Sequence, residues 1–92
     1  MARLDNDEID AKLAELDGWA HEGDAITKEF DNGDFKGSVE FVNQLTPEAE
    51  EMNHHPDLEI SWDTVKVTIT THSEGGLTAG DFELAARIDA LG

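Results

Sequence analysis

The strongest constraint on the fold is a period-two alternation of apolar residues between positions 58 and 71. Successive side chains of a β-strand point to opposite faces, so this alternation predicts two half-buried strands. A short polar segment near Asp63 forms a tight turn between them, so the two strands must be antiparallel. The alternating positions are Leu58, Ile60 and Trp62 in the first strand, and Val65, Val67, Ile69 and Thr71 in the second.

A second hairpin is predicted earlier in the chain. Strands over Trp19–His21 and Ala25–Phe30 flank the turn sequence Glu22-Gly23-Asp24. Ile26 and Phe30 then lie on a common face. The chain therefore contains two pairs of antiparallel strands.

The first of three predicted helices begins at Asp5, with Glu8 as the reciprocal residue of a capping box, and ends at Gly18. The last helix follows a similar capping box of Thr78 and Asp81. Apolar residues recur at helical spacing after both caps. They are Ile9, Leu13 and Leu16 in the first helix, and Phe82, Ala85, Ile88 and Leu91 in the last.

The middle helix is the longest and runs from Asp34 to Met52. We expect a kink or a restart at Thr46-Pro47, because proline cannot donate a hydrogen bond to the preceding turn but suits the first position of a new helical segment. The apolar residues of this helix are Phe35, Val39, Val42, Leu45, Ala49 and Met52.

The element order is therefore helix, two strands, helix, two strands, helix. Half-polar strands need a helical cover on one face only. This order predicts an α+β fold, a four-stranded antiparallel sheet with three helices packed on one face. A chain of 92 residues suits a single domain, which we place over residues 1–92.

The chain is strongly acidic, with 22 Asp and Glu against 6 Lys and Arg and a formal net charge of −16. This charge repels phosphate backbones and anionic lipids, so direct nucleic-acid binding and membrane binding are not expected. The acids are spread between periodic apolar positions, which indicates a folded domain with an acidic surface. Such a surface suggests a halophilic protein in a salt-rich cytoplasm, where screening relieves self-repulsion.

Two further features restrict the class of protein. The chain has no cysteine, which excludes disulfides, thiolate nucleophiles and cysteine-based metal sites. It lacks an N-terminal signal peptide and any apolar stretch of membrane-spanning length, so we expect a soluble cytoplasmic protein. On folding, a domain of this size buries only about 60–65% of the surface that its unfolded chain exposes. We therefore expect a homodimer or homotetramer to add stability.

Three of the four histidines lie where predicted elements end. His54 and His55 close the middle helix, and His72 closes the last strand. Imidazole gains and loses protons near neutral pH, so a histidine cluster suits acid–base chemistry such as the elimination of water, without a cofactor. Adjacent residues do not share a helix face, so His54 and His55 are expected to do different work. Glu50, one helical turn before His54, is a candidate to orient that ring.

Each candidate also has a purely structural interpretation. A histidine at a helix end commonly interacts with the helix dipole, and His21, alone on a strand, is given a structural role of this kind. Glu50 is one of many acids on a solvated helix, and the capping box explains Asp81. We expect Trp19 and Trp62 in the core. A zinc site is not favoured, because the histidines lack paired spacing with a consistent third ligand.

Two separated blocks of sequence carry a family signature. The first, 50–56, has an acid, three residues and then His-His-Pro. The second, 71–78, begins with Thr-His, contains Gly-Leu-Thr and leads to Asp81. In this order and spacing, with an aromatic at Trp62 between them, the blocks resemble the pterin-4a-carbinolamine dehydratase family. Asn53 stands where the family commonly has an acid, and tyrosine is frequent at the position of Trp62.

The resemblance implies a dehydratase that converts 4a-hydroxytetrahydropterin to quinonoid dihydropterin and water, with no metal or organic cofactor. It also implies four antiparallel strands with three helices on one face, assembled as dimers or tetramers. The residues it implies are His54, His55 and His72 for catalysis, Glu50 and Asp81 for support of the histidines, and Pro56, Thr71, Ser73 and Glu74 beside the pterin.

Within this assignment, His54 and His72 are predicted to be the acid–base pair, with Glu50 orienting His54 and His55 positioning the ring. The competing interpretation is a non-catalytic pterin-binding module, or an oligomeric partner protein, on the same fold. The intact set of histidines favours the enzyme.

Overall fold

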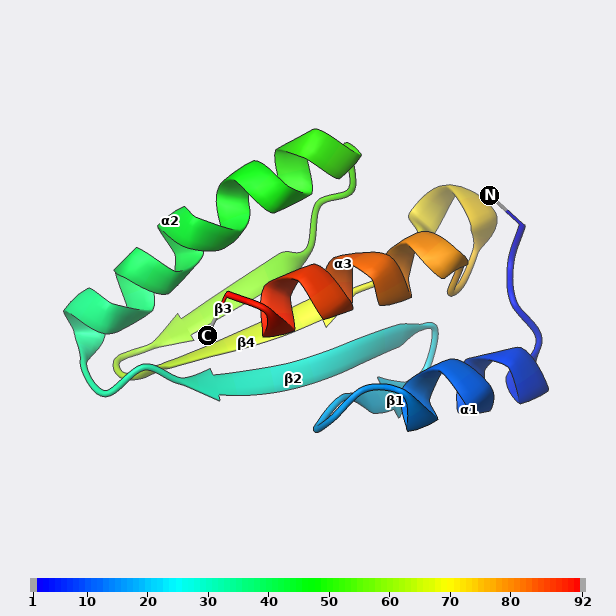
Figure 1. Cartoon of the computed structure of the whole chain (residues 1–92), viewed down its shortest axis with the longest axis horizontal. Helices are drawn as coiled ribbons and strands as arrows, with labels where there is room; N and C mark the ends of the chain where they lie inside the picture. The colour runs from blue at the N-terminus through cyan, green and yellow to red at the C-terminus, as the bar shows by residue number, and fades with distance from the viewer. Residues whose placement is uncertain (1, 92) are drawn as a thin grey trace.

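The computed structural model describes residues 2–91 and confirms the α+β fold and the predicted element order (Figure 1). The four strands form one antiparallel sheet in the order β1-β2-β4-β3. The strands are β1 (Ala20–Glu22), β2 (Ala25–Asp31), β3 (Asp57–Ser61) and β4 (Thr64–Ile69); the helices are α1 (Asn6–Ala14), α2 (Phe35–Met52) and α3 (Ala79–Asp89), with a 3₁₀ turn η1 (His72–Glu74).

One face of the sheet is apolar and the other is polar. In β4 the residues Val65, Val67 and Ile69 are fully buried, while Lys66 and Thr68 between them are partly exposed. Residues directly opposite in neighbouring strands share a face, so the β2 residues paired with these apolar positions also face the core. The helices complete the core from this side with Ile9, Phe41, Leu45, Ala49, Phe82, Leu84, Ala85 and Ile88.

Both predicted capping boxes are present. The Asp5 carboxylate accepts from the Glu8 N–H at 2.8 Å, and Glu8 accepts from the Asp5 N–H at 3.1 Å. The box of Thr78 and Asp81 opens α3. Local side-chain chemistry thus determines where these two helices begin.

The predicted restart at Thr46-Pro47 is wrong, because α2 continues through Pro47 to Met52. The Thr46 hydroxyl does not cap a new segment but donates back to the Val42 carbonyl at 2.7 Å. Leu45 and Ala49, on either side of the proline, are both buried in the core. Tertiary packing therefore holds the helix together across a residue that would end it in isolation.

The hairpin of β3 and β4 differs from the prediction at the end of each strand. β3 ends at Ser61, so Trp62 lies in the turn with a φ of 51° and is 71% exposed. The expectation that Trp62 is a core residue is wrong, whereas Trp19 is buried as expected. β4 ends at Ile69, and Thr71 forms only an isolated bridge with Gly76. His72 therefore opens η1 instead of closing the strand.

The edge strand β3 carries uncovered apolar residues. Leu58 and Ile60 pair with Val67 and Val65, and so face the same side of the sheet as the core. Both are nevertheless exposed, as are Phe35 and Val39 on α2 and Trp62 in the turn. The Ser38 hydroxyl donates to the Trp62 carbonyl at 2.8 Å, which joins the start of α2 to this turn.

Candidate active site

The predicted site residues gather at one end of the sheet. His54 and His55 lie between the end of α2 and the start of β3, and the segment from Thr71 follows the end of β4. β3 and β4 are antiparallel neighbours, with Asp57 opposite Thr68. The two sequence blocks, far apart along the chain, therefore meet at the same edge, beside the first turn of α3.

Asn53 turns the chain out of α2 and places the two histidines. It has left-handed backbone angles, φ 50° and ψ 44°, a conformation that asparagine tolerates better than most residues. Its N–H donates to the carbonyls of Ala49 and Glu50, and the His54 N–H donates to the Ala49 carbonyl at 3.0 Å. The helix end is thereby satisfied, and His54 and His55 leave the helix instead of extending it.

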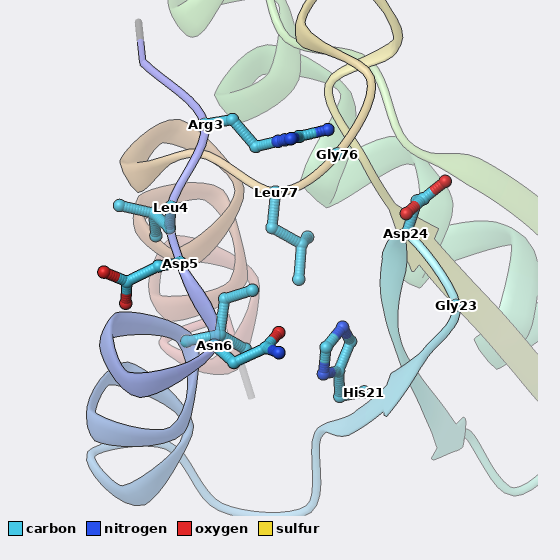
Figure 2. Close-up of a pocket in the computed structure, with 10 residues that line it drawn as sticks. Arg3, Leu4, Asp5, Asn6, His21, Gly23, Asp24, Gly76 and Leu77 are labelled. Carbon is cyan, nitrogen blue, oxygen red and sulfur yellow. The ribbon is translucent and has the colours of Figure 1, made fainter.

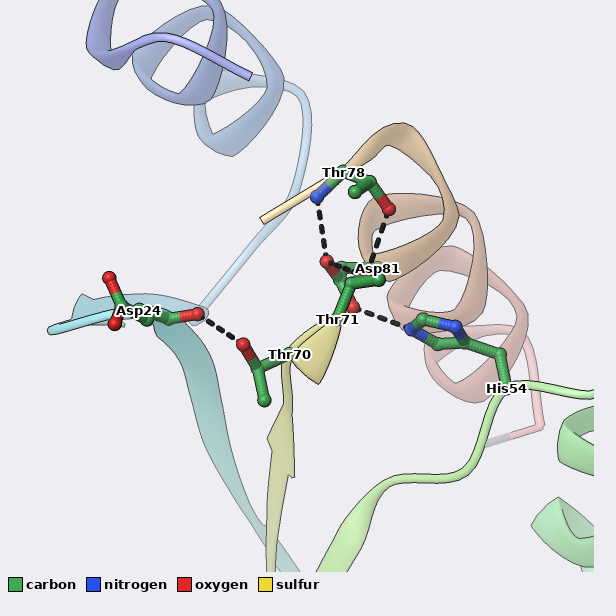
Figure 3. A network of polar contacts seen from close by, with 6 residues as sticks. All are labelled: Asp24, His54, Thr70, Thr71, Thr78 and Asp81. Atoms are coloured by element: carbon green, nitrogen blue, oxygen red, sulfur yellow. Dashed lines mark hydrogen bonds and ion pairs between the residues drawn. The ribbon is translucent and has the colours of Figure 1, made fainter. Parts of the chain in front are cut away.

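His54 is bound to a buried carboxylate. Its Nε2 lies 2.6 Å from Oδ1 of Asp81, and the two side chains are 16% and 0% exposed (Figure 3). The other oxygen, Oδ2, accepts from the Thr71 hydroxyl at 2.8 Å and from the Thr78 N–H at 2.8 Å. A buried carboxylate needs such donors to offset its desolvation, and Oδ2 has two of them.

Glu50 does not contact His54 as predicted, because it pairs with Nε2 of His55. The two adjacent histidines therefore have separate carboxylate partners. The His55 and Glu50 side chains are 56% and 66% exposed, so water surrounds this second pair. His54 sits in a fixed, nearly buried environment, and His55 in a solvated one.

The remaining candidate residues lie in the segments that follow β4 and precede β3. His72, Ser73 and Glu74 form η1 and are exposed, and Pro56 is partly buried just before β3. η1 is held by the Gly75 N–H, which donates to the His72 carbonyl at 3.1 Å. The Thr71 side chain, expected beside the pterin, directs its hydroxyl to Asp81.

A cavity of about 330 Å³ lies next to the same loop, between α1, the β1–β2 turn and Gly76 (Figure 2). Its lining includes Arg3, Asn6, His21 and Leu77 and none of the three histidines at the sheet end. His21, given a structural role from the sequence, is one of the residues that line this cavity.

An ion-pair cluster joins α2, which ends just before His54, to α3, which carries Asp81. Arg87 of α3 lies 2.9 Å from Glu51 and 3.5 Å from Glu48 of α2, and 3.4 Å from Glu83. The pKa of Arg87 is raised above its ordinary value, mainly by the hydrogen bond to Glu51, against an opposing effect of desolvation. These exposed contacts are individually weak, but they link the end of α2 to α3.

Residues 2–91 contain neither a cluster suited to bind a metal ion nor a helix suited to span a membrane. No group of three or more His, Cys, Asp or Glu side chains is arranged to hold a metal ion. None of the helices in this range combines the length and the apolar character needed to cross a membrane.

The sequence of residues 2–91 matches the family model described as pterin 4 alpha carbinolamine dehydratase. The chain belongs to this family. A relative from Sulfolobus acidocaldarius, provisionally named pterin-4-alpha-carbinolamine dehydratase, is 45% identical over 97% of this chain and 98% of its own. A relative from Thermosynechococcus vestitus with the same provisional name is 48% identical over 97% of this chain and 94% of its own.

Solved structures agree with the pterin carbinolamine dehydratase fold. A Brucella melitensis protein described as a transcriptional coactivator/pterin dehydratase superposes with a TM-score of 0.92 at 36% identity, covering 97% of both chains. A pterin dehydratase-like protein identified as a RuBisCO assembly factor of the alpha-carboxysome has a TM-score of 0.65 at 24% identity, covering 79% of this chain and 84% of its own. The second likeness is one of fold alone.

Two residues that shape the candidate site, Asn53 and Thr78, are not among those predicted from the sequence. Asn53 was noted only as a departure from the family pattern, although asparagine at a helix end is itself a signal for a left-handed cap. Thr78 was identified as a helix cap, but its hydroxyl also lies 3.0 Å from that of Thr71. No sequence signal distinguishes a capping threonine from one that also belongs to a site network.

Proposed function

We propose that this chain removes water from a 4a-hydroxytetrahydropterin to give the quinonoid dihydropterin, in the recycling of tetrahydropterins in the cytoplasm. The single observation that carries the proposal is the bond between His54 and the buried Asp81, formed by residues of the two family blocks. A histidine whose ring is fixed by a buried carboxylate is suited to proton transfer at a defined position.

The reaction requires two proton movements and no redox change. The C4a–O bond breaks as the hydroxyl accepts a proton and leaves as water. The neighbouring N5 loses its proton, and the electrons left on nitrogen form the C4a=N5 double bond. We assign the two transfers to His54 and His72, with Asp81 in place of Glu50 as the residue that orients His54. Which histidine gives and which takes depends on the face of the pterin that each one meets.

The other family residues are given binding roles. We propose that His55, steadied by Glu50, positions the pterin ring, since this exposed pair can move to meet a ligand. Pro56, Ser73 and Glu74 border the same end of the sheet and complete the pterin contacts. Thr71 contributes through its backbone and its bond to Asp81.

The test is the rate at which freshly generated 4a-hydroxytetrahydropterin dehydrates, followed by stopped-flow absorbance. The carbinolamine also dehydrates unaided, so every trace is compared with a protein-free control. Because one positioned proton-transfer group contributes about 10²–10⁴-fold, His54→Ala and His72→Ala should each lower turnover by that order. His55→Ala should raise KM more than it lowers kcat.

The matched control is His21→Ala, which removes a histidine outside both family blocks and should leave turnover unchanged. If a double variant of His54 and His72 dehydrated substrate as fast as the parent chain, the proposed function would be wrong. A non-catalytic pterin-binding or partner module is the alternative. The assembly-factor role named for one structural neighbour motivates it, and pterin binding without acceleration over the protein-free control would favour it.

A further inference from the structure

We infer that Thr78 and Thr71 are positioning residues that act through Asp81 to keep the proton of His54 on Nε2, so that Nδ1 is the ring nitrogen that meets the substrate. The catalytic meaning of this inference rests on the proposed function. Its structural part is the tautomer of one histidine, which is measurable without substrate.

Asp81 is fully buried, so its hydrogen bonds are made to the protein. Its Oδ2 accepts two hydrogen bonds, from the Thr78 N–H and from the Thr71 hydroxyl, both at 2.8 Å. Two donors aimed at one oxygen favour the ionised carboxylate, which can only accept hydrogen bonds. The 2.6 Å contact between Oδ1 and Nε2 of His54 therefore takes its proton from the ring.

The hydroxyl groups of Thr71 and Thr78 form a chain of contacts that ends at Asp81. Thr71 has one hydroxyl proton, and it is given to Asp81. The 3.0 Å contact between the hydroxyls of Thr71 and Thr78 therefore requires Thr78 to donate. Thr78 is fully buried, so water does not compete for its proton. The hydrogen bonds between the residues drawn in Figure 3 are therefore inferred to run in one direction, from Thr78 to Thr71 to Asp81.

The contact with Asp81 leaves His54 one free ring nitrogen for chemistry. With Nε2 donating to Asp81, Nδ1 of the neutral ring carries a lone pair and can take a proton from the substrate. The same nitrogen can return that proton from the charged ring. The imidazole ring cannot flip freely to exchange the positions of its two nitrogens. The left-handed turn at Asn53 fixes the backbone of His54, and the His54 side chain is only 16% exposed. The network thus selects one nitrogen for the chemistry.

The experiment is ¹⁵N NMR of the histidine ring nitrogens in the substrate-free parent chain and in Asp81→Asn. The parent should show the Nε2–H tautomer at His54. In Asp81→Asn, the amide oxygen should accept the two hydrogen bonds that Oδ2 accepts in the parent. The NH₂ group then faces Nε2 of His54 and donates to it, so Nε2 must be an acceptor. His54 should then change to the Nδ1–H tautomer. A parent with Nδ1–H, or an Asp81→Asn chain with an unchanged tautomer, overturns the inference.

A second set of variants tests the threonines and does not depend on Asp81→Asn folding. Thr71→Val keeps the side-chain shape but removes one donor to Asp81, so it should raise the fraction of Nδ1–H tautomer and lower kcat about tenfold with little change in KM. Thr71→Ser should restore both, and Thr78→Val should shift the tautomer in the same direction as Thr71→Val.

The matched control is Thr70→Val. The Thr70 hydroxyl donates to the Asp24 carbonyl and not to Asp81, so the tautomer of His54 should stay as in the parent (Figure 3). Equal tautomer fractions in Thr71→Val and Thr70→Val contradict the inference. The two proposals fail separately: a parent with Nε2–H that does not accelerate dehydration removes the proposed function only, and an active parent with Nδ1–H removes this inference only.

Discussion

A methyl group at Gly76 should disturb the loop that carries His72 through a clash with Arg3. A Cβ built on Gly76 lies 2.8 Å from Cδ and 3.3 Å from Cγ of Arg3. The first distance is shorter than real side chains tolerate, so the arginine stem must move off the loop. The backbone at Gly76 is not the obstacle, since this residue is outside the set of positive-φ glycines within residues 2–91.

The magnitude of the change follows from two opposing effects. Overpacking costs about 1–3 kcal/mol, and a middle value of about 2 kcal/mol suits a clash with a partly mobile side chain. Alanine also restricts the unfolded chain, which stabilises the protein by about 0.4–1 kcal/mol. We expect Gly76→Ala to lower the free energy of unfolding by about 1 kcal/mol in the parent. In an Arg3→Ala background the clash is absent, and Gly76→Ala should raise the free energy of unfolding by about 0.4–1 kcal/mol.

Urea unfolding of the parent, the two single variants and the double variant measures this change of sign. A net loss of about 1 kcal/mol corresponds to a decrease of roughly 4–8 °C in Tm. Gly37→Ala is the contrasting control: its Cβ would lie 2.2 Å from the Asn32 carbonyl oxygen, a backbone atom that no side-chain truncation removes. The reasoning is refuted if Gly76→Ala has the same effect on stability with and without the Arg3 side chain.

Three other outcomes are expected. We propose that the chain self-associates through the exposed apolar edge at β3, so Ile60→Lys should shift the sedimentation of the parent towards monomer; a parent that is monomeric at micromolar concentration contradicts this. The net charge of −16 predicts that Tm rises from low to molar salt as repulsion is screened, and a flat salt series would remove the halophilic interpretation. Asp89 accepts a hydrogen bond from Nε1 of the buried Trp19 at 3.0 Å. Asp89→Ala should therefore lower the free energy of unfolding by about 1–3 kcal/mol, and Asp89→Asn should lower it by less. Chemical denaturation measures both changes.

The sheet was predictable because its signal is local. The alternation of Val65, Val67 and Ile69 reports directly which residues face the core, and the structure buries all three. Alternation does not report where a strand ends. Trp62 continues the pattern of Leu58 and Ile60 but lies in the turn, where the left-handed backbone directs it into solvent.

The partner of His54 was not predictable from spacing. The rule that residues four apart lie on one helix face holds only while the helix continues, and α2 ends at Met52. After the left-handed turn at Asn53, Glu50 reaches His55 instead. The carboxylate that His54 does meet is 27 positions away in sequence, a contact that depends on how α3 packs on the sheet.

Asp81 shows how one residue can satisfy two interpretations. The capping box accounted for it locally, and the family resemblance gave it a role in supporting the histidines. Its two oxygens divide these tasks, since Oδ2 accepts from the Thr78 N–H at the helix start and Oδ1 faces His54. A complete local explanation of a residue therefore does not exclude a role in the site.

Burial is what separates the two imidazole–carboxylate pairs of this acidic chain. Surface carboxylates are abundant here, but water and salt compete for any hydrogen bond they make, and an exposed pair such as Glu50 with His55 holds a ring only weakly. Asp81 is the one acidic residue that is buried within residues 2–91. Its field on His54 is little screened at any salt concentration, because the protein and not the solvent supplies the donors around it. A chain with many acids can thus keep one imidazole in a constant environment by burying one carboxylate beside it.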